Sequence, residues 1–446
     1  MSHQEIAELI PPTTHVIGIS CMFTVDWLST CSLVNFLGKM FPSAIIVAGG
    51  EHVTALPEFC MQQCPALQVC ALGEGEETIL EICEAFAGTQ PWSEVKGIIY
   101  RQPDGSLNKT ERRERVRSLD TLPRPAWQLF PTATYFRNKL NFGVGGKRTL
   151  PILATRGCPY VCSFCSSPEM WGTRYFMRSV ENVVNEIEYL VKNYGVENID
   201  LYDLTAIINA RWIIDFSKEL LRRQLHITWQ LPSGTRSEAI TPEVLHYMKI
   251  SGCTVVTYAP ENGSDRILNL IHKKVNLSKM LHSIKHSNQE GIYVKINIIL
   301  GFPQETHRDV WKTIVFILKA SWYGAYDMGP NPFYPIPGTE LFNELQKQGK
   351  VDIYNASYFD ALLDADNMWK VTFYNEYVSH RMLKLYFLFY FFVFYTSNFV
   401  FRPARLFTTI WNVATLNAQT RGQYVLQRII EQNRILRAVQ PSGSID

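Results

Sequence analysis

Three cysteines lie within eight residues of one another, directly after a short apolar run that predicts a buried strand. The run is PILAT (151–155), and Cys158, Cys162 and Cys165 follow it in the stretch TRGCPYVCSFCSSP. Three thiolates this close can reach one metal centre only if the chain wraps around it, and thiolates favour zinc or iron-sulfur centres. A closed zinc site needs four protein ligands, yet residues 166–200 contain no further Cys or His. The motif therefore predicts a 4Fe-4S cluster with one iron left open.

The cysteine motif opens a regular alternation of strand and helix patterns. Short runs rich in β-branched residues predict six strands, and helical spacing predicts five helices between them. The strands are PILAT (151–155), ENIDLYD (197–203), ITWQLP (227–232), TVVTYAP (254–260), VKINIILG (294–301) and AYDMGPNPFYP (325–335), and the helices lie near 179–194, 210–223, 241–251, 277–290 and 306–322. This α/β alternation predicts a partial (β/α)6 barrel of the TIM type, with the active site at the carboxyl ends of the strands.

A shorter α/β pattern precedes the barrel and predicts a Rossmann-like parallel sheet. Its strands are expected at 15–20, 44–50, 67–73 and 97–101, and its helices at 27–40, 54–62 and 76–87. The charged run KTERRERVR and a Pro-rich stretch then follow without periodicity, which is typical of a linker. We expect an N-terminal domain at 1–103, a linker at 104–148, the barrel at 149–337 and a helical C-terminal region at 338–446.

The charge balance and the cysteine count limit the class of protein. Lys and Arg number 43 against 41 for Asp and Glu, so the net charge of +2 predicts no binding to nucleic acid. The N-terminus lacks a basic segment followed by an apolar one, which predicts a cytoplasmic location. In that reducing compartment the ten cysteines are free thiols or metal ligands, and the seven outside the motif are expected to be small buried residues.

The cysteine spacing, Phe164 before the last cysteine and the barrel context together resemble the radical S-adenosylmethionine (SAM) superfamily. The resemblance implies that Cys158, Cys162 and Cys165 hold a 4Fe-4S cluster, that its open iron binds SAM, and that Phe164 lies beside the cofactor. One electron from an external donor then cleaves SAM to methionine and a 5′-deoxyadenosyl radical. The protein positions the cofactor and excludes water.

Three later strand ends resemble the SAM-binding segments of that family. LYDLTA implies that Asp203 contacts the methionine amino group in place of the family's usual Gly-Gly-Glu. YAPENGS implies ribose contacts from Glu261 and Ser264, and NIILGFPQET implies that Gly301 lies on the adenine side. An acidic residue at a strand end also serves as a helix cap or an ion-pair partner, so a structural role stays open for Asp203 and Glu261.

Two glycine turns in the N-terminal half resemble the cobalamin-binding domain that many of these enzymes carry. AGGEHVTALPE and LGEGEETILE each close a strand and open a helix, where backbone N–H groups can face an anionic ligand. The resemblance implies cobalamin contacts from Gly49, Gly50, Glu51, His52, Gly73, Glu74 and Gly75.

This chain departs from the pattern of that domain in two ways. It begins where the third of the usual five strands lies, so we expect a truncated domain with one bare sheet edge. It also contains no DxHxxG motif, and His52 is not equivalent to the histidine that ligates cobalt.

The C-terminal region contains an aromatic, uncharged segment, LYFLFYFFVFYTSNFVF (385–401). The segment is slightly shorter than the ~20 residues that span a bilayer, and it includes polar residues, so we expect a buried or interface-lying helix. Lys384, Arg402 and Arg405 flank it and can reach lipid headgroups. Residues 385–405 therefore predict a peripheral membrane contact.

These features predict a radical SAM enzyme of the cobalamin class, acting as a methyltransferase or a cyclase on an apolar small molecule. Two alternatives remain, a radical SAM enzyme without cobalamin and a non-catalytic iron-sulfur electron-transfer protein. The sequence assigns no residue to a catalytic role beyond cofactor binding.

Overall fold

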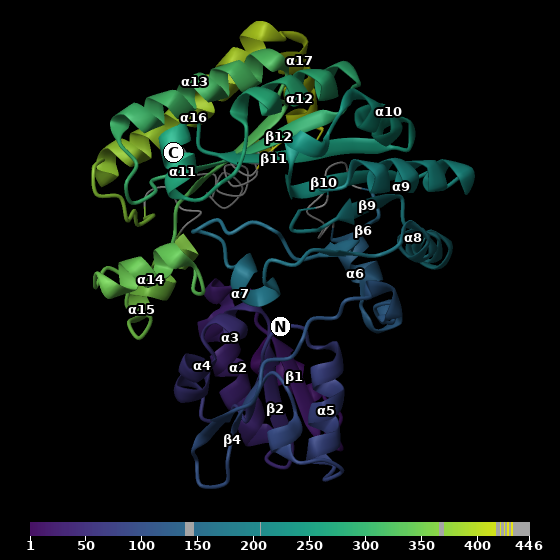
Figure 1. Cartoon of the computed structure of the whole chain (residues 1–446), viewed down its shortest axis with the longest axis vertical. Coiled ribbons are helices and arrows are strands. Elements are labelled where there is room, and N and C mark those ends of the chain that lie inside the picture. The colour runs from purple at the N-terminus through teal and green to yellow at the C-terminus, as the bar shows by residue number, and fades with distance from the viewer. Residues whose placement is uncertain are drawn as a thin grey trace, which may run out of the picture.

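The computed structural model describes residues 1–138, 147–205, 207–364 and 370–415, together with residues 420, 423, 426, 427 and 430. Residues 139–146 of the predicted linker and most of the predicted helical region beyond 415 lie outside the described residues. The N-terminal α/β domain forms one end of the molecule and the partial barrel forms the other (Figure 1).

Six parallel strands form the partial barrel in the order β13-β12-β11-β10-β9-β6, which confirms the predicted fold class. The strands are β6 (Thr149–Ile152), β9 (Asn198–Leu201), β10 (Thr228–Thr235), β11 (Cys253–Glu261), β12 (Tyr293–Leu300) and β13 (Asp327–Pro332). The helices that follow them and cover the sheet are α8 (Val180–Tyr194), α9 (Ala210–Arg222), α10 (Pro242–Ile250), α12 (Leu277–Gln289) and α13 (His307–Tyr323), with the short α11 (Asp265–Leu270) directly after β11.

Strand β12 shows how one sequence pattern serves both the core and a cavity. Alternate residues Val294, Ile296, Ile298 and Leu300 are fully buried in the core that α13 also enters. Burying each such aliphatic side chain contributes about 1.5–3 kcal/mol. The residues between them point to the opposite face of the sheet, and two of these, at positions 297 and 299, line the cavity described below.

The N-terminal sheet has the order β1-β2-β3-β4-β5. Strands β1 (Val16–Ser20), β2 (Ile45–Gly49) and β3 (Val69–Ala71) pair in parallel, as predicted. The prediction of a parallel strand at 97–101 was wrong, because β4 (Ile98–Arg101) and β5 (Leu107–Lys109) are antiparallel. The first residue of β4, Ile98, pairs with Ala71, the last residue of β3, so the two strands run in opposite directions. A tight turn at Gly105 (φ +85°) then returns the chain as β5. Within the described residues β1 pairs only with β2, so the expected bare edge is present.

The three predicted N-terminal helices are present, one of them divided at a proline, and the short helix α1 was not predicted. The helices of this domain are α1 (His3–Glu8), α2 (Trp27–Met40), α3 (Glu51–Ala55), α4 (Pro57–Gln63) and α5 (Glu76–Phe86). The single helix expected at 54–62 is divided into α3 and α4. Pro57 has no backbone N–H and restricts Leu56, which adopts φ −133° and ψ 51° and so ends the first helix.

The segment predicted to be a linker is bonded to both domains. Arg113 pairs with Glu77 and Glu81 of α5, whereas the indole N–H of Trp127 donates to Glu186 of α8 at 3.1 Å. Its described part contains one α-helix, α6 (Thr132–Arg137). These contacts fix the N-terminal domain relative to the barrel.

The C-terminal region packs on both domains. Helices α14 (Glu340–Lys347) and α15 (Ala356–Leu363) bury Phe342 and Phe359 in the core of the N-terminal domain. Helix α16 (His380–Phe401) lies along α13 and buries Tyr390 and Phe394 in the barrel core, and α17 (Ala404–Ala414) follows it. The C-terminal helices therefore stabilise both halves of the molecule.

Candidate cofactor-binding sites

A cavity of about 420 Å³ lies at the carboxyl ends of the barrel strands. Cys158, Cys162 and Cys165 all line it, and Phe164 lines it while its ring packs edge-on against Phe302 at 5.6 Å. The structure thus brings together the three predicted cluster ligands and the aromatic residue between them. Their binding of iron and SAM remains a prediction.

The loop that carries the cysteines has a conformation that requires glycine at its start. It leaves β7 (Thr155–Arg156), which pairs with β8 (Phe176–Met177), and α7 (Ser167–Trp171) follows its last cysteine. Gly157 has φ +90°, and a Cβ there would collide with the carbonyl oxygen of Arg174. Glycine avoids both problems because it has no Cβ.

The thiols fit a cluster better than a single metal ion. Burial raises the pKa of Cys165 to about 12 and also raises the pKa of Cys162, so without metal these thiols keep their protons. Bound iron replaces the protons. Among the residues that the structure describes, no three His, Cys, Asp or Glu side chains surround one position closely enough for a single ion. In a cubane each thiolate binds a different iron, so the sulfur atoms lie farther apart than around zinc.

Positive side chains face the cysteines across the cavity. Lys273 and Arg236 both line it, and their charges oppose the effect of burial on the pKa of Cys162. The Lys273 ammonium contacts Glu261 at 2.8 Å, and the Arg236 guanidinium lies 3.4 Å from the centre of the Tyr160 ring. Such charges stabilise the net negative charge that thiolate ligands give a cluster.

Glu261, a predicted SAM contact at the end of β11, lines this cavity. Its backbone has φ +63°, which is uncommon for a residue other than glycine. The ion pair with Lys273 holds its carboxylate, and both side chains are about nine-tenths buried. The positioning is consistent with the predicted ribose contact, and it also supplies the structural ion pair left open by the sequence.

Asp203 lies behind the cysteine loop and is fully buried. Its Oδ1 accepts hydrogen bonds from the backbone N–H and the hydroxyl of Thr155, which fastens the end of β9 to β7. Burial raises the pKa of Asp203 to about 6. Its Oδ2 has no hydrogen-bond donor within the described part of the chain. That oxygen is buried behind the cysteine loop, and the predicted contact of Asp203 with SAM stays a prediction.

The other two predicted SAM contacts lie outside the cavity lining. The Ser264 hydroxyl donates to Asp309 at 2.6 Å, and the N–H of Gly301 donates to Glu305 at 2.6 Å. Glu305 also accepts from the Asn262 amide at 2.6 Å, so this buried network joins the loops after β11 and β12. Both residues support the loops that shape the cavity.

Glu305 should make stability depend on pH. Burial raises its pKa from 4.5 to about 7 even though two donors favour its charged form. Between pH 4.5 and pH 7 the Glu305 carboxyl keeps its proton in the folded chain and loses it in the unfolded chain. The contribution of Glu305 to the free energy of unfolding therefore falls as the pH rises through 7. From pH 6 to pH 8 the expected loss is about 1.4 kcal/mol. The free energy of unfolding of the wild type minus that of Glu305→Gln should fall by about 1.4 kcal/mol from pH 6 to pH 8; an unchanged difference would contradict this.

The glycine turn after β2 meets the barrel directly. Gly50 has φ +107°, and a Cβ there would lie 2.5 Å from the carbonyl oxygen of Cys21, so the turn packs tightly against the loop after β1. The Glu51 carboxylate accepts a hydrogen bond from the hydroxyl of Ser166, the residue after Cys165. The carboxyl end of the N-terminal sheet therefore touches the cluster loop.

His52 lies in the core of the N-terminal domain. It is 2% exposed, its Nδ1 lies 3.1 Å from the Thr24 hydroxyl, and its ring packs on Trp27 at 5.1 Å. Burial lowers the pKa of His52 to about 4, so the ring is neutral near pH 7. This position favours a packing role over the predicted contact with cobalamin.

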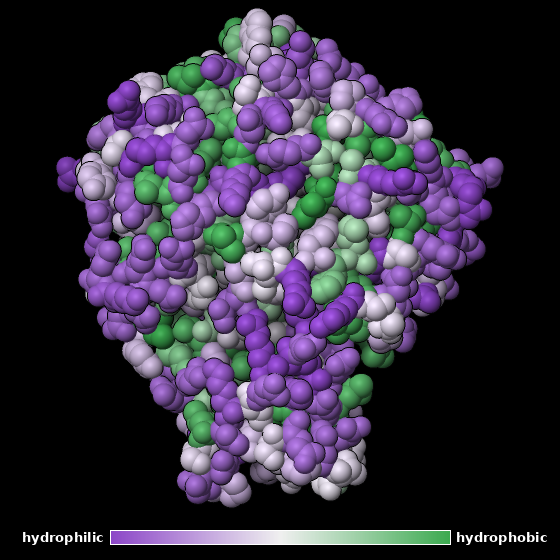
Figure 2. All heavy atoms as spheres, viewed as in Figure 1, coloured by the Kyte–Doolittle hydropathy of each residue, from purple (hydrophilic) through white to green (hydrophobic). Residues whose placement is uncertain are grey.

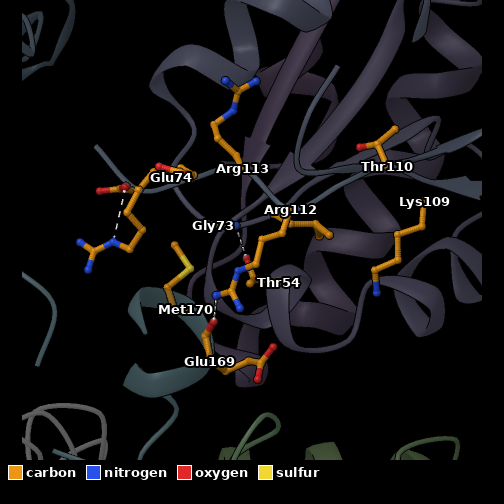
Figure 3. A pocket seen from close by; sticks show the side chains of 12 residues that line it. Thr54, Gly73, Glu74, Lys109, Thr110, Arg112, Arg113, Glu169 and Met170 are labelled. Atoms are coloured by element: carbon orange, nitrogen blue, oxygen red, sulfur yellow. Dashed lines mark hydrogen bonds and ion pairs between the residues drawn. The ribbon is translucent and has the colours of Figure 1, made fainter. Parts of the chain in front are cut away.

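The glycine turn after β3 lies beside a second cavity, of about 220 Å³, between the N-terminal domain and α7 (Figure 3). The Gly73 N–H donates to Thr54, and Gly73 and Gly75 have no atom within 4 Å of the position of a Cβ. Glu74 instead binds across the interface: it pairs with Arg156 at 3.0 Å and accepts from the Val116 N–H at 2.8 Å. This carboxylate joins the sheet, the linker and β7.

Sequence reasoning missed the arginines that hold this interface. Arg156 also pairs with Glu76, and Arg115 donates to the carbonyl oxygens of Trp171 at 2.6 Å and Arg174 at 2.8 Å. Arg115 lies in the charged run KTERRERVR and Arg156 lies directly before the cysteine loop, and neither position carries a local signal for its partner. The linker arginines therefore fix the loop that bears the cysteines.

The carboxyl edge of the N-terminal sheet fits a large anionic cofactor only in part. Its glycine turns offer backbone close to the barrel, but a cavity of about 220 Å³ is below the 300–1,000 Å³ typical of small-molecule pockets. A corrinoid is larger than the ligands of such pockets.

A parallel partial barrel with three cysteines at its mouth, beneath a second α/β domain, defines a class of iron-sulfur enzymes with two cofactor-binding domains. Comparison with known proteins then gives the family. The sequence matches the radical SAM superfamily over residues 152–317 and the B12 binding domain over residues 3–83.

Curated relatives and a solved structure agree with these matches. An uncharacterised methyltransferase of Pyrococcus horikoshii is 30% identical over 77% of this chain and 72% of its own length. Cytidylyl-2-hydroxyethylphosphonate methyltransferase of Streptomyces wedmorensis is 29% identical over 79% of this chain and 71% of its own. The radical SAM methyltransferase TsrM of Kitasatospora setae, solved with cobalamin and a 4Fe-4S cluster, has a TM-score of 0.63 at 18% identity and covers 78% of this chain and 66% of that one.

The chain belongs to the radical SAM superfamily, in the group whose members carry an N-terminal B12-binding domain. The predicted family, fold class, enzyme class and cofactors are thereby confirmed. A non-catalytic electron-transfer protein is not supported.

Proposed function

We propose that this chain is a cobalamin-dependent radical SAM methyltransferase that methylates a carbon of a largely apolar small molecule. The observation that carries the proposal is the contact between Glu51 and Ser166, since it places the B12-binding edge against the residue after Cys165. The residues that would hold the two cofactors therefore lie next to each other. The names of the two curated relatives support methylation.

The cavity lining supports an apolar substrate with a polar end. Val275, Met280, Ile299, Phe333 and Ile336 contribute apolar surface, whereas positive charge is confined to Arg236 and Lys273. Apolar contacts give affinity and the few charged groups fix the orientation. A cyclisation is the second candidate function, because two curated relatives are named anaerobic magnesium-protoporphyrin IX monomethyl ester cyclase.

The residues of the chain orient and shield the reactants. Cys158, Cys162 and Cys165 would hold the cluster, and the Thr205 hydroxyl donates to the Cys158 sulfur at 3.3 Å. When bound, the cluster and SAM supply a 5′-deoxyadenosyl radical, and cobalamin supplies a transferable methyl group. Phe164 lines the cavity and packs against the buried Phe302, so this wall is apolar.

The electron for SAM cleavage has to come from outside the chain. All the cysteines in the described residues are free, and only the three at the barrel mouth share one cofactor cavity. A second cluster ligand set is therefore not available within the part of the chain that the structure describes. We expect a low-potential donor protein of a reducing compartment, which fits the predicted cytoplasmic location.

Anaerobic incubation with SAM, cobalamin and a strong reductant tests the proposal. After cluster reconstitution, mass analysis should find 5′-deoxyadenosine and S-adenosylhomocysteine together, because methylation uses SAM twice. Formation of 5′-deoxyadenosine alone, with cobalamin bound, would favour cyclisation or rearrangement. Absence of corrin absorbance after gel filtration would overturn the role of cobalamin.

A further inference from the structure

Three helices on the barrel side of the molecule each expose several large apolar side chains. Helices α13, α16 and α17 lie together at the end of the molecule away from the N-terminal sheet (Figure 1). We call their exposed apolar residues the outer aromatic face, which comprises Trp311, Val315, Leu318, Trp322, Leu385, Leu388, Phe392, Val400, Phe407, Ile410 and Trp411. Figure 2 shows hydrophobic residues at the surface of this region among hydrophilic ones.

Ring contacts join the exposed side chains of α13 and α16. Trp311 of α13 packs against Phe389 of α16 at 6.0 Å, and Trp322 packs against Phe401 at 4.8 Å, yet the two tryptophans remain 51% and 60% exposed. On α17, Phe407 and Trp411 are 70% and 69% exposed. Monomeric proteins rarely expose so many large side chains together unless the surface binds something.

The charges on these helices have one sign. Arg308, Lys312, Lys319 and Arg381 are exposed, whereas α16 and α17 contain no Asp or Glu. The single acidic residue of α13, Asp309, is buried and paired with Arg266. Although the net charge of the chain is only +2, this face presents positive charge beside apolar rings.

The face lies on the barrel wall and does not belong to a spanning helix. Within the described residues α16 is the one helix long and apolar enough to cross a membrane. Its inner side, however, is bonded into the barrel: the Asn398 amide donates to the carbonyl oxygen of Ala325 at 2.9 Å, and Ser397 donates to Ser321 at 2.8 Å. Leaving the barrel would expose these polar groups and the buried Tyr390.

We propose that the outer aromatic face binds the surface of a bilayer that contains anionic lipids. Tryptophan and phenylalanine side chains insert at the level of the headgroups, and the lysines and arginines contact lipid phosphates. Two open hollows along α13, of about 750 and 410 Å³, are lined by Trp311, Lys312, Lys319 and Trp322 and leave room for headgroups. The proposal stands independently of the methyl transfer proposed above.

Vesicle sedimentation of the full chain with its cluster reconstituted tests this surface. We expect binding to vesicles of phosphatidylcholine with 30% phosphatidylglycerol and little binding to phosphatidylcholine alone. The double substitution Phe407→Ser and Trp411→Ser should weaken binding at least tenfold, because both rings are exposed and their loss leaves the core unchanged. Lys312→Glu with Lys319→Glu should weaken it by a similar factor, and 0.5 M salt should do the same.

Two matched control variants separate this effect from general changes of surface. Leu129→Ser with Phe130→Ser removes exposed apolar side chains of the linker, and Lys39→Glu with Lys347→Glu makes the same change of charge elsewhere. Both controls should bind vesicles like the wild type. All variants should keep their thermal unfolding temperature and their cleavage of SAM, which makes failure here distinct from failure of the proposed function.

Two results would overturn the proposal. One is binding that is absent, or equal for neutral and anionic vesicles and insensitive to salt. The other is a concentration-dependent dimer in analytical ultracentrifugation that Phe407→Ser with Trp411→Ser abolishes, since the face would then belong to a second copy of the chain.

Discussion

Replacing Cys162 by alanine should remove the iron-sulfur cluster and abolish cleavage of SAM. Two thiolates cannot hold a cubane whose fourth iron is reserved for a substrate, and residues 166–200 offer no Cys or His to take the lost place. Iron and sulfide per chain should fall from about four to near zero, together with the visible absorbance of the cluster. The rate of 5′-deoxyadenosine formation should fall at least 10³-fold, since no radical can form without the cluster.

Cys253→Ala is the matched control for this substitution. Cys253 is 1% exposed in the barrel core, where burial raises the pKa of its thiol and keeps it protonated. Its loss should cost about 1 kcal/mol of unfolding free energy and leave iron content unchanged. Equal loss of iron in Cys162→Ala and Cys253→Ala would contradict the assignment of the three ligands.

Asp203→Ala should loosen the cluster loop even though Asp203 does not line the cavity. The carboxylate holds the backbone N–H and the hydroxyl of Thr155, three residues before Cys158. Its removal leaves two buried donors without a partner, which costs about 1–3 kcal/mol for each. We expect a lower unfolding temperature and a several-fold loss of iron after gel filtration.

Asp203→Asn separates this positioning role from the predicted contact with SAM. Its amide oxygen can still accept from Thr155, so the cluster should be retained at close to wild-type occupancy. If Asp203 also binds the ammonium group of SAM, the KM for SAM should rise at least tenfold in Asp203→Asn while iron content stays constant. An unchanged KM would assign Asp203 to loop positioning alone, and full iron retention in Asp203→Ala would contradict that role as well.

The barrel and the cluster motif could be predicted because their signals are local. The alternation along β12 and the helical spacing of α13 each arise within one element, where burial on one face sets the period. The three cysteines share one loop, so their convergence on a cavity follows from chain geometry. The match of the observed strands to the predicted runs at 197–203 and 294–301 illustrates this.

The direction of β4 was not predictable from its sequence. An apolar run of β-branched residues such as Ile98–Arg101 forms a parallel or an antiparallel strand equally well. The path of the connecting segment decides between them, and in the structure Trp92 of that segment stacks on Tyr100 of β4 at 5.8 Å. A residue pattern that repeats every two positions carries no information about direction.

The roles of Glu74, Ser264 and Gly301 also depended on tertiary contacts. Each lies in a motif that resembles a cofactor-binding segment, yet Glu74 pairs with Arg156 of the other domain and Ser264 donates to Asp309. Gly301 has φ +90° and packs against Phe373. A side chain near a strand end can point into a cavity or behind it, and only the packed neighbours settle which.

The sequence by itself determined the two α/β units, the iron-sulfur loop and the family, because each is written in spacing within a short stretch. Only the tertiary structure decided that the linker arginines and Glu51 join the two cofactor domains, and that α14 and α15 return to complete the N-terminal core. The tertiary structure also decided that α16 buries one face in the barrel core and exposes the opposite face to solvent. These outcomes depend on contacts between residues far apart in the chain. The free energy of such a contact cannot be predicted from a local sequence pattern.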